Sequence, residues 1–265
     1  MTRFIALFVA LVAGVGVAVW YYRAPANGIP TAIVRNDDRW LEGLQSRSPK
    51  DVAEATALLE ERGTAALPLI RRTLQDPAAD PARRQAALKA TAILGARAAE
   101  AIPDVAAALQ EPDYAPEAAL ALSFMGSAAV PPLQDAVNSN EAIVRREALR
   151  ALGKLRERAS TDPKIVVPLL LRAIDDADAS VRNVAVTYLG IVRDDPAAEV
   201  TGLIKALADE NAEVRQAAAA ALAEYGTLAE RATPALKKAA SDPDEEVRRE
   251  AGRTLVRLSE LKQKK

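Results

Sequence analysis

Apolar residues recur along most of the chain with the spacing of amphipathic helices, and the pattern returns every 33 to 37 residues. Four ten-residue segments superpose without gaps, and each opens with a Val-Arg pair: residues 144–153, 181–190, 214–223 and 247–256. Apolar residues at the first, fifth, eighth and ninth positions form one stripe along a helix. Each segment is therefore predicted to be the same helix of a repeated unit, with one buried face.

A second helix is predicted in front of each segment. Five residues before each Val stands a polar turn residue, in turn Ser139, Asp176, Asp209 and Asp242. Thirteen residues before it stands a residue suited to the first turn of a helix, in turn Pro131, Pro168, Thr201 and Pro234. Each unit is thus predicted as helix A, a short turn that caps helix B, and helix B. The glycines that follow helix B are expected to end it in a left-handed conformation: Gly63, Gly95, Gly126, Gly153 and Gly190.

The same pattern divides the whole chain. Two looser copies cover residues 68–95 and 103–126, which brings the number of predicted repeats to six. Residues 37–63 read as a degenerate helix pair that covers the open end of the stack. The predicted organisation is a transmembrane segment over 1–23, a linker over 24–36, the cap over 37–63, and six repeats with a short basic tail over 64–265.

The recurring Pro-x-Leu, Asp and Val-Arg-x-x-Ala-x-x-x-Leu-Gly positions resemble HEAT repeats, and they are most similar to the short HEAT-like repeats of the phycobilisome-lyase type. The resemblance covers residues 65–260. It implies an all-α fold, a right-handed, armadillo-like α-solenoid of helix pairs that binds other macromolecules. It also implies that Asp and Arg six residues apart, such as Asp176 and Arg182, form a ladder of charged hydrogen bonds between neighbouring repeats.

The N-terminus reads as a membrane segment. Residues 4–22 carry no charge and would span about 28 Å as a helix, close to the ~30 Å hydrocarbon core of a bilayer. Aromatic residues from Trp20 to Tyr22 stand where an interfacial belt is expected. An uncleaved single-pass anchor is the favoured interpretation, and a signal peptide cleaved near Ala26 is the alternative, which gives a secreted or periplasmic protein.

Two further expectations concern this segment. Arg3 and the free N-terminus favour an N-terminus in the cytoplasm, which places the repeats on the periplasmic side of a bacterial inner membrane. Small residues recur every four positions, which would let two such helices approach closely and form a dimer. These residues are Ala6, Ala10, Gly14 and Ala18.

The amino-acid composition excludes several kinds of catalytic and metal site. The chain contains no histidine and no cysteine, which excludes Ser-His-Asp and Cys-His nucleophiles, Cys/His zinc sites and disulfides. It has no phosphate-binding glycine loop and no calcium loop. The sequence therefore predicts no enzyme activity, no cofactor and no metal. The 35 basic and 36 acidic residues argue against a dedicated nucleic-acid binder, which is usually basic on one face.

Partner-binding residues are predicted on helix B, which usually lines the concave face of such solenoids. The third, fourth and seventh positions of the ten-residue segment are expected to be exposed. The candidates are Leu120, Arg146, Glu147, Arg150, Asn183, Val184, Thr187, Gln216, Arg249 and Arg253. Phe124 and Tyr188 are expected to fill the packing between repeats, because large apolar residues are mostly buried.

The favoured function is a membrane-anchored scaffold that binds a protein partner through an extended solenoid surface. The first alternative is a role like that of bilin lyases and isomerases of the HEAT-like type, acting on or with a chromophore-binding protein. The second is nucleic-acid binding, which ranks last because the helix-B faces carry glutamates beside the arginines and few aromatics.

Overall fold

The computed structural model describes residues 39–158 and 161–263, and every regular element in these two ranges is a helix. The all-α prediction is confirmed for this part of the chain. The predicted anchor over residues 4–22, its small-residue stripe, the linker and the cleavage point near Ala26 all lie outside the described residues. Among the helices that the structure describes, none combines the length and the apolar character needed to cross a membrane.

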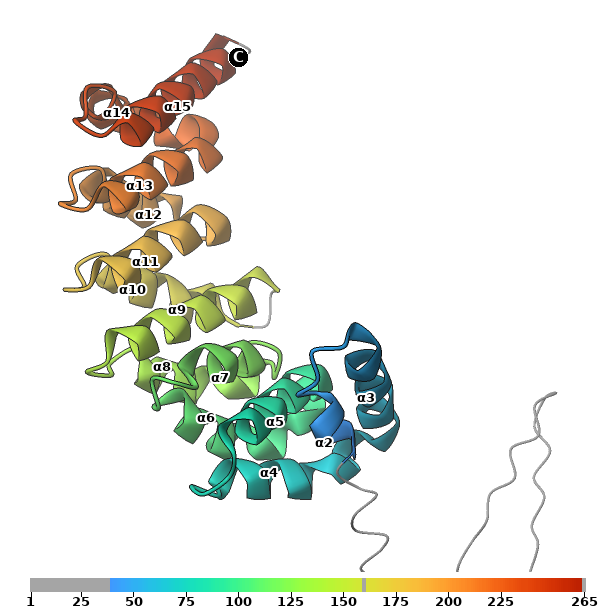
Figure 1. The fold of residues 1–265 in the computed structure, drawn as a ribbon. Coiled ribbons are helices and arrows are strands. Elements are labelled where there is room, and N and C mark those ends of the chain that lie inside the picture. Colours follow the sequence, from blue (N-terminus) through green and yellow to red (C-terminus); the bar gives the residue numbers. More distant parts are fainter. Residues whose placement is uncertain (1–38, 159–160, 264–265) are drawn as a thin grey trace, which may run out of the picture. The chain divides into compact units, whose positions relative to one another are not determined.

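The helices follow one another as pairs, and residues Trp40–Lys265 form one compact unit (Figure 1). The first pair is α2 (Arg39–Gly43) and α3 (Pro49–Arg62). The helices A that follow are α4 (Leu67–Gln75), α6 (Ile102–Leu109), α8 (Val130–Ala136), α10 (Pro163–Ala173), α12 (Pro196–Ala206) and α14 (Thr233–Ala239). The helices B are α5 (Pro81–Leu94), α7 (Ala115–Leu122), α9 (Ala142–Glu157), α11 (Ala179–Val192), α13 (Ala212–Glu224) and α15 (Glu245–Gln263).

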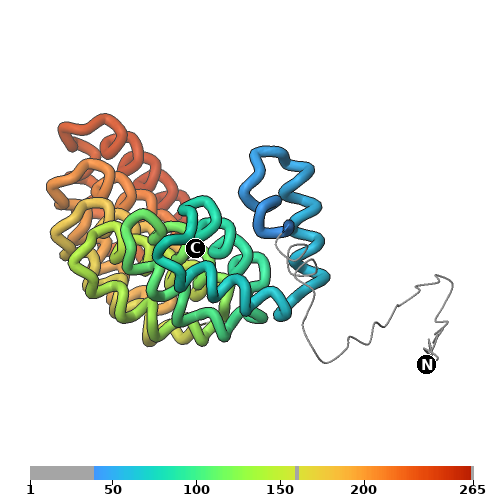
Figure 2. Tube along the Cα trace, turned by 60° about the horizontal axis from the view of Figure 1, so that its bottom comes forward, coloured from blue at the N-terminus to red at the C-terminus, as the bar shows by residue number. Residues whose placement is uncertain are grey.

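Within this unit the pairs stack in chain order, as the traces in Figures 1 and 2 show. Successive helices B from α5 to α15 pack directly against each other, and α3 packs on α5. The interior is rich in alanine and leucine, and side chains such as Leu88, Leu122, Leu152 and Leu189 have at most 1% of their surface exposed. Small alanine side chains let neighbouring helices approach closely, so the core continues from one repeat to the next.

The polar turns before α11 and α15 cap helix B as predicted, whereas the N-cap residue of α9, Glu141, makes no such side-chain hydrogen bond. The carboxylate of Asp178 accepts hydrogen bonds from the backbone N–H groups of Ser180 and Val181, and Asp244 does the same for the first turn of α15. A carboxylate at this position satisfies amide groups that have no partner within the helix and complements the helix dipole.

Two predicted glycine roles are wrong. Gly63, Gly95 and Gly126 have positive φ values of 55° to 77° and end helix B as expected. Gly153 and Gly190 instead lie inside α9 and α11, which continue to Glu157 and Val192. A Cβ atom on Gly153 would lie 2.2 Å from the ring of Tyr188, and one on Gly190 would lie 2.8 Å from the Cβ of Ala221. These two glycines therefore allow neighbouring helices B to pack closely rather than ending a helix.

Two predicted starts of helix A are also wrong. Pro168 and Thr201 lie inside α10 and α12, which begin five residues earlier, at Pro163 and Pro196. In both cases an aspartate side chain caps the helix and a proline follows in its first turn. This Asp-Pro pair is a strong start signal, because it supplies the cap and a residue whose missing N–H is not needed.

The Asp–Arg ladder is confirmed. Arg182 donates from Nε and Nη2 to the two carboxylate oxygens of Asp209 in the next repeat, at 2.7 and 2.8 Å. Its Nη1 donates to the carbonyls of Asp176 and Ala177 in its own turn, at 3.0 and 3.1 Å. The same arrangement joins Arg145 to Asp176 and Arg215 to Asp242. Each arginine thus fixes its own turn and the register of the following repeat.

Candidate protein-binding surface

The outward stripe of each helix B is narrower than predicted. Leu120, Arg150, Thr187, Arg249 and Arg253 are exposed, and Arg146, Asn183 and Gln216 are half-buried. Glu147 and Val184 are buried, with 3% and 7% of their surface exposed, so the expectation that the fourth position is exposed is wrong at both. In α9 and α11 the helices B on both sides cover the fourth position and leave the third and seventh, whereas in α7 the fourth position, Leu120, is the exposed one.

The stripe also continues beyond the ten-residue segment. The eleventh position, four residues after the seventh, is at least partly exposed on α9, α11, α13 and α15. The residues there are Lys154, Ile191, Glu224 and Arg257. The outward positions therefore recur every four residues along each helix B. Together with Leu120, Phe124 and Arg158, the third, seventh and eleventh positions of α9, α11, α13 and α15 form what we call the B-helix surface.

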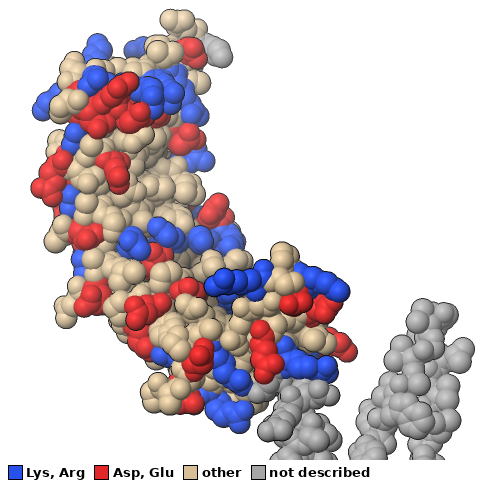
Figure 3. All heavy atoms as spheres, viewed as in Figure 1, with Lys and Arg blue, Asp and Glu red and all other residues tan. Residues whose placement is uncertain are grey.

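Basic side chains follow α9 on this surface. Arg146, Arg150, Lys154 and Arg158 are spaced four residues apart, and Figure 3 shows the basic side chains gathered over α9. The buried carboxylate of Glu147 lies between two of them, 2.9 Å from Arg146 Nε and 3.2 Å from Arg150 Nη1. The predicted residue Glu147 is therefore an internal counter-charge for these arginines and not a contact residue.

Large apolar side chains stand next to this row. Leu120 on α7 and Phe124 just after it are 42% and 43% exposed. The expectation that Phe124 is buried between repeats is wrong. The guanidinium of Arg158 lies 4.2 Å above the centroid of its ring and donates a 2.7 Å hydrogen bond to the carbonyl of Ser123. Tyr188, in contrast, packs against Gly153 with 8% of its surface exposed, as predicted.

The remaining helices B carry a different balance of charge. The outward positions of α11 are uncharged, namely Asn183, Thr187 and the 41% exposed Ile191. On α15 each arginine of the stripe has an acidic partner. Arg249 pairs with Glu246, Arg253 with Glu250 at 3.3 Å, and Arg257 with Glu224 of α13 at 2.9 Å.

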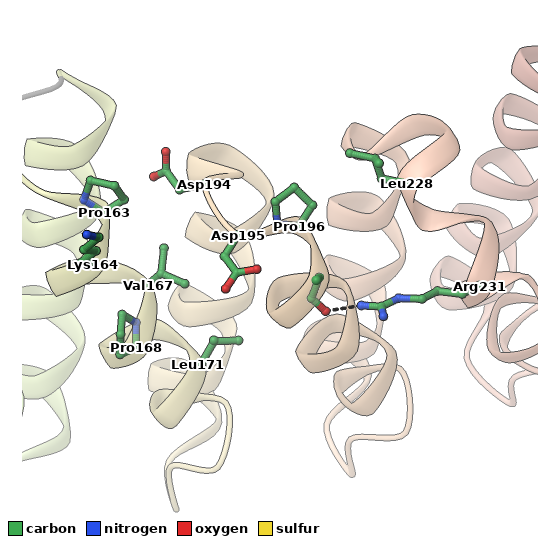
Figure 4. A pocket seen from close by; sticks show the side chains of 11 residues that line it. Pro163, Lys164, Val167, Pro168, Leu171, Asp194, Asp195, Pro196, Leu228 and Arg231 are labelled. Atoms are coloured by element: carbon green, nitrogen blue, oxygen red, sulfur yellow. Dashed lines mark hydrogen bonds between the residues drawn. The ribbon is translucent and has the colours of Figure 1, made fainter.

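A separate open pocket lies between helices A. It has a volume of about 890 Å³ and lies between α10, α12 and the 3-10 segment Gly226–Ala232 (Figure 4). Its apolar lining comes from Val167, Pro168, Leu171 and Leu228 among others, and Asp194 and Arg231 stand at its edge. No sequence signal pointed to this pocket, because its walls come from three different repeats.

The most deeply buried carboxyl group belongs to Glu199 on α12, a side chain with no exposed surface. Burial raises its pKa, against a hydrogen bond from the backbone N–H of Asp194, and its Oε2 lies 3.0 Å from the hydroxyl oxygen of Tyr225. The group is closed to solvent and ties α12 to α13, so it stabilises the stack and cannot meet a substrate. Across the described residues, no cluster of three or more His, Cys, Asp or Glu side chains is arranged to hold a metal ion.

Comparison with known proteins supports the reading of the repeats. The sequence profile of HEAT repeats matches residues 131–200 and 200–264, which together make up half of the chain. No curated protein matches the sequence.

Solved structures share the fold. The complex of CpcE and CpcF of phycocyanin lyase from Nostoc sp. PCC7120 is similar, with 24% identity and a TM-score of 0.50, over 58% of this chain and 98% of that chain. Kap95p, solved with RanGDP, is 16% identical with a TM-score of 0.63, over 82% of this chain and 33% of that chain. Kap121p is also 16% identical with a TM-score of 0.63, over 87% of this chain and 30% of that chain. The chain thus spans about a third of these two longer proteins, and identities this low show the common fold alone.

Proposed function

Because the chain belongs to the HEAT-repeat family, we propose that it is a non-catalytic scaffold that binds a protein partner through the B-helix surface. The observation that carries this proposal is the exposure of Leu120, Phe124 and Ile191 on that surface, each more than 40% accessible. Exposed large apolar side chains often mark a binding site for another protein. The similar solenoids CpcE and Kap95p were solved with CpcF and RanGDP, which supports a protein as the partner.

We further propose that residues 4–22 anchor the protein in a bacterial inner membrane, with the repeats on the periplasmic side. The support is the uncharged apolar run, its length and the positive charge in front of it. Fusion of alkaline phosphatase or green fluorescent protein after Lys265 tests the orientation. Phosphatase activity in a membrane-bound fusion is expected, and fluorescence without phosphatase activity contradicts the periplasmic placement.

Site-specific photo-crosslinking in the full chain tests the scaffold. A benzophenone side chain replaces Thr187 or Gln216 on the B-helix surface, and Lys237 on α14 serves as the control position, since it is exposed on a helix A. Crosslinks to one protein from Thr187 and Gln216, with none from Lys237, are the expected result. Crosslinks from Lys237 alone contradict the proposed surface. A bilin absorbance that accompanies the purified protein, or crosslinked nucleic acid, contradicts a protein scaffold.

A further inference from the structure

One part of the B-helix surface combines fixed positive charge with exposed apolar side chains. We call it the α7–α9 surface and define it by Leu120, Phe124, Arg150, Lys154 and Arg158. Helices α7 and α9 pack directly against each other, and the guanidinium of Arg158 bridges them by stacking on Phe124. The five side chains therefore belong to one continuous patch.

The positive charge of α9 is not balanced within the patch. Four basic residues follow one edge of this helix, and Arg146 and Arg150 share the single carboxylate of Glu147. Lys154 makes no ion pair within the described ranges 39–158 and 161–263, and Glu157 is the exposed acid at this end of the helix. Like charges four residues apart destabilise a helix, so this row opposes the stability of α9 when it stands alone.

Helix α15 provides an internal comparison. Its arginines occupy the same outward positions as the row on α9, yet each of them pairs with a glutamate. The repeat therefore accommodates a row of outward arginines together with their counter-charges. On α9 the counterpart of Glu250 is Glu147, which Arg146 and Arg150 share, while Ile143 stands at the position of Glu246. The row on α9 thus has fewer counter-charges than basic residues, which is the arrangement expected when a partner supplies the rest.

The apolar half of the patch is held in a defined position. Phe124 has Arg158 on one ring face, and that guanidinium is fixed by the carbonyl of Ser123 at 2.7 Å. A cation that is already positioned against an aromatic ring loses little conformational freedom when a carboxylate approaches. Leu120 extends the apolar area beside the ring.

We propose that the α7–α9 surface binds an acidic segment of a protein, with carboxylates on the basic row and a large apolar side chain against Leu120 and Phe124. This inference rests on the proposed scaffold function and names the class of partner. A single-stranded nucleic acid fits less well, because such sites stack successive bases on several aromatic side chains. Phe124 is the one aromatic residue of the patch, and the outward positions of the neighbouring α11 are uncharged.

Fluorescence anisotropy with the full chain in non-ionic detergent tests the inference. The probe is a labelled peptide of glutamates with a central pair of phenylalanines. One matched peptide has lysine at every glutamate, and another has alanine at both phenylalanines. Lys154→Glu reverses a half-buried charge in the patch, Phe124→Ala removes the ring, and Lys237→Glu makes the same charge change on α14 as the control.

The acidic aromatic peptide is expected to bind, and both matched peptides are expected to bind more weakly. Lys154→Glu should weaken its binding about tenfold, because one attraction is lost and one repulsion is added. Phe124→Ala should weaken it about fivefold. Lys237→Glu should leave binding unchanged, and thermal unfolding of all three variants checks that they are folded.

Three results overturn the inference: no binding of the acidic peptide, equal binding of the lysine peptide, or equal loss in Lys154→Glu and Lys237→Glu. Tighter binding of single-stranded DNA of equal charge, lost in Lys154→Glu, would reassign the patch to nucleic acid. The photo-crosslinks at Thr187 and Gln216 separate the two proposals. If they persist while acidic peptides fail to bind, the scaffold stands and the acidic partner class does not.

Discussion

The hydroxyl group of Tyr225 lies 3.0 Å from the carboxyl group of Glu199, and both side chains are buried between α12 and α13. The same hydroxyl lies 2.6 Å from the carbonyl oxygen of Leu189 on α11. A phenol has one proton to donate, and the shorter contact to Leu189 takes it. The contact to Glu199 then requires that the carboxyl group carries a proton and donates to Tyr225. Burial, which raises the pKa of Glu199, favours the same neutral form.

This arrangement predicts a loss of stability as pH rises. The pKa of Glu199 is higher in the folded protein than in the unfolded chain. Its contribution to the stability of the fold is therefore fully present below the unfolded pKa. It is lost as pH rises through the folded pKa. Glu199→Gln keeps a donor for Tyr225 and an acceptor for the Asp194 N–H, so its unfolding temperature should vary less from about pH 5 to about pH 8. Circular dichroism melts measure this.

Glu230→Gln is the matched control, since Glu230 is exposed in the 3-10 segment before α14. It should keep the pH profile of the parent protein. If Glu199→Gln shows that same profile as well, Glu199 is ionised in the folded protein and the proton assignment is wrong.

The sequence revealed the repeated unit but not which residues face solvent. Because Arg182 and Asp209 recur at a fixed period, the sequence indicated a structural role for both residues. The ladder confirms that role. The burial of Glu147 and Val184 depends on how closely neighbouring helices B flank each other, which the pattern of one helix does not contain. Lys154 and Arg158 were missed because they lie beyond the ten-residue segment that repeats, although their four-residue spacing from Arg150 was visible.

Two local misassignments have a different cause. Gly153 and Gly190 fit either a helix end or a close helix contact, and only the partner side chains Tyr188 and Ala221 decide between them. The pocket beside Leu228 is lined by residues from three repeats, so no local sequence motif predicts it.

Arg182→Ala should lower the stability of the fold strongly. The substitution removes the bidentate contact to Asp209, a carboxylate with 9% of its side-chain surface exposed, and two hydrogen bonds to carbonyls. Removing one partner of a buried ion pair costs about 3 to 5 kcal/mol. Lys205→Ala removes the exposed pair with Asp175, which should cost less than about 1 kcal/mol. Urea unfolding of both variants measures the difference, and equal losses would show that the ladder does not hold the register.

The ladder also predicts how the protein responds to acid. Burial alone would raise the pKa of Asp209, but the hydrogen bonds from Arg182 and from the backbone N–H of Asn211 outweigh it and lower the pKa. Asp176 and Asp242 have lowered pKa values as well. A lowered pKa contributes stability that is present above the unfolded value, near 3.8, and is lost as pH falls through the folded value.

Asp209→Asn tests this directly. The variant should be less stable at neutral pH, because the Arg182 charge loses its partner, and its stability should fall less steeply below about pH 4. Urea unfolding at a series of acidic pH values measures the slope, with Asp195→Asn, an exposed residue, as the comparison. A slope that is unchanged in Asp209→Asn would show that its carboxylate does not drive acid unfolding.

The contact between Gly153 and Tyr188 predicts opposite effects for two glycine substitutions. A Cβ atom at position 153 would lie 2.2 to 2.6 Å from three ring atoms of Tyr188, so Gly153→Ala forces α9 and α11 apart and should cost about 1 to 3 kcal/mol. Gly252 lies in α15 with nothing within 4 Å of its Cβ position. Gly252→Ala should therefore stabilise the protein by up to about 1 kcal/mol, through helix propensity alone.

Adding Tyr188→Ala to Gly153→Ala should cost less stability than Tyr188→Ala does in the parent protein, because the two side chains compete for the same space. Additive losses in urea unfolding would show that the glycine is not needed for this helix contact.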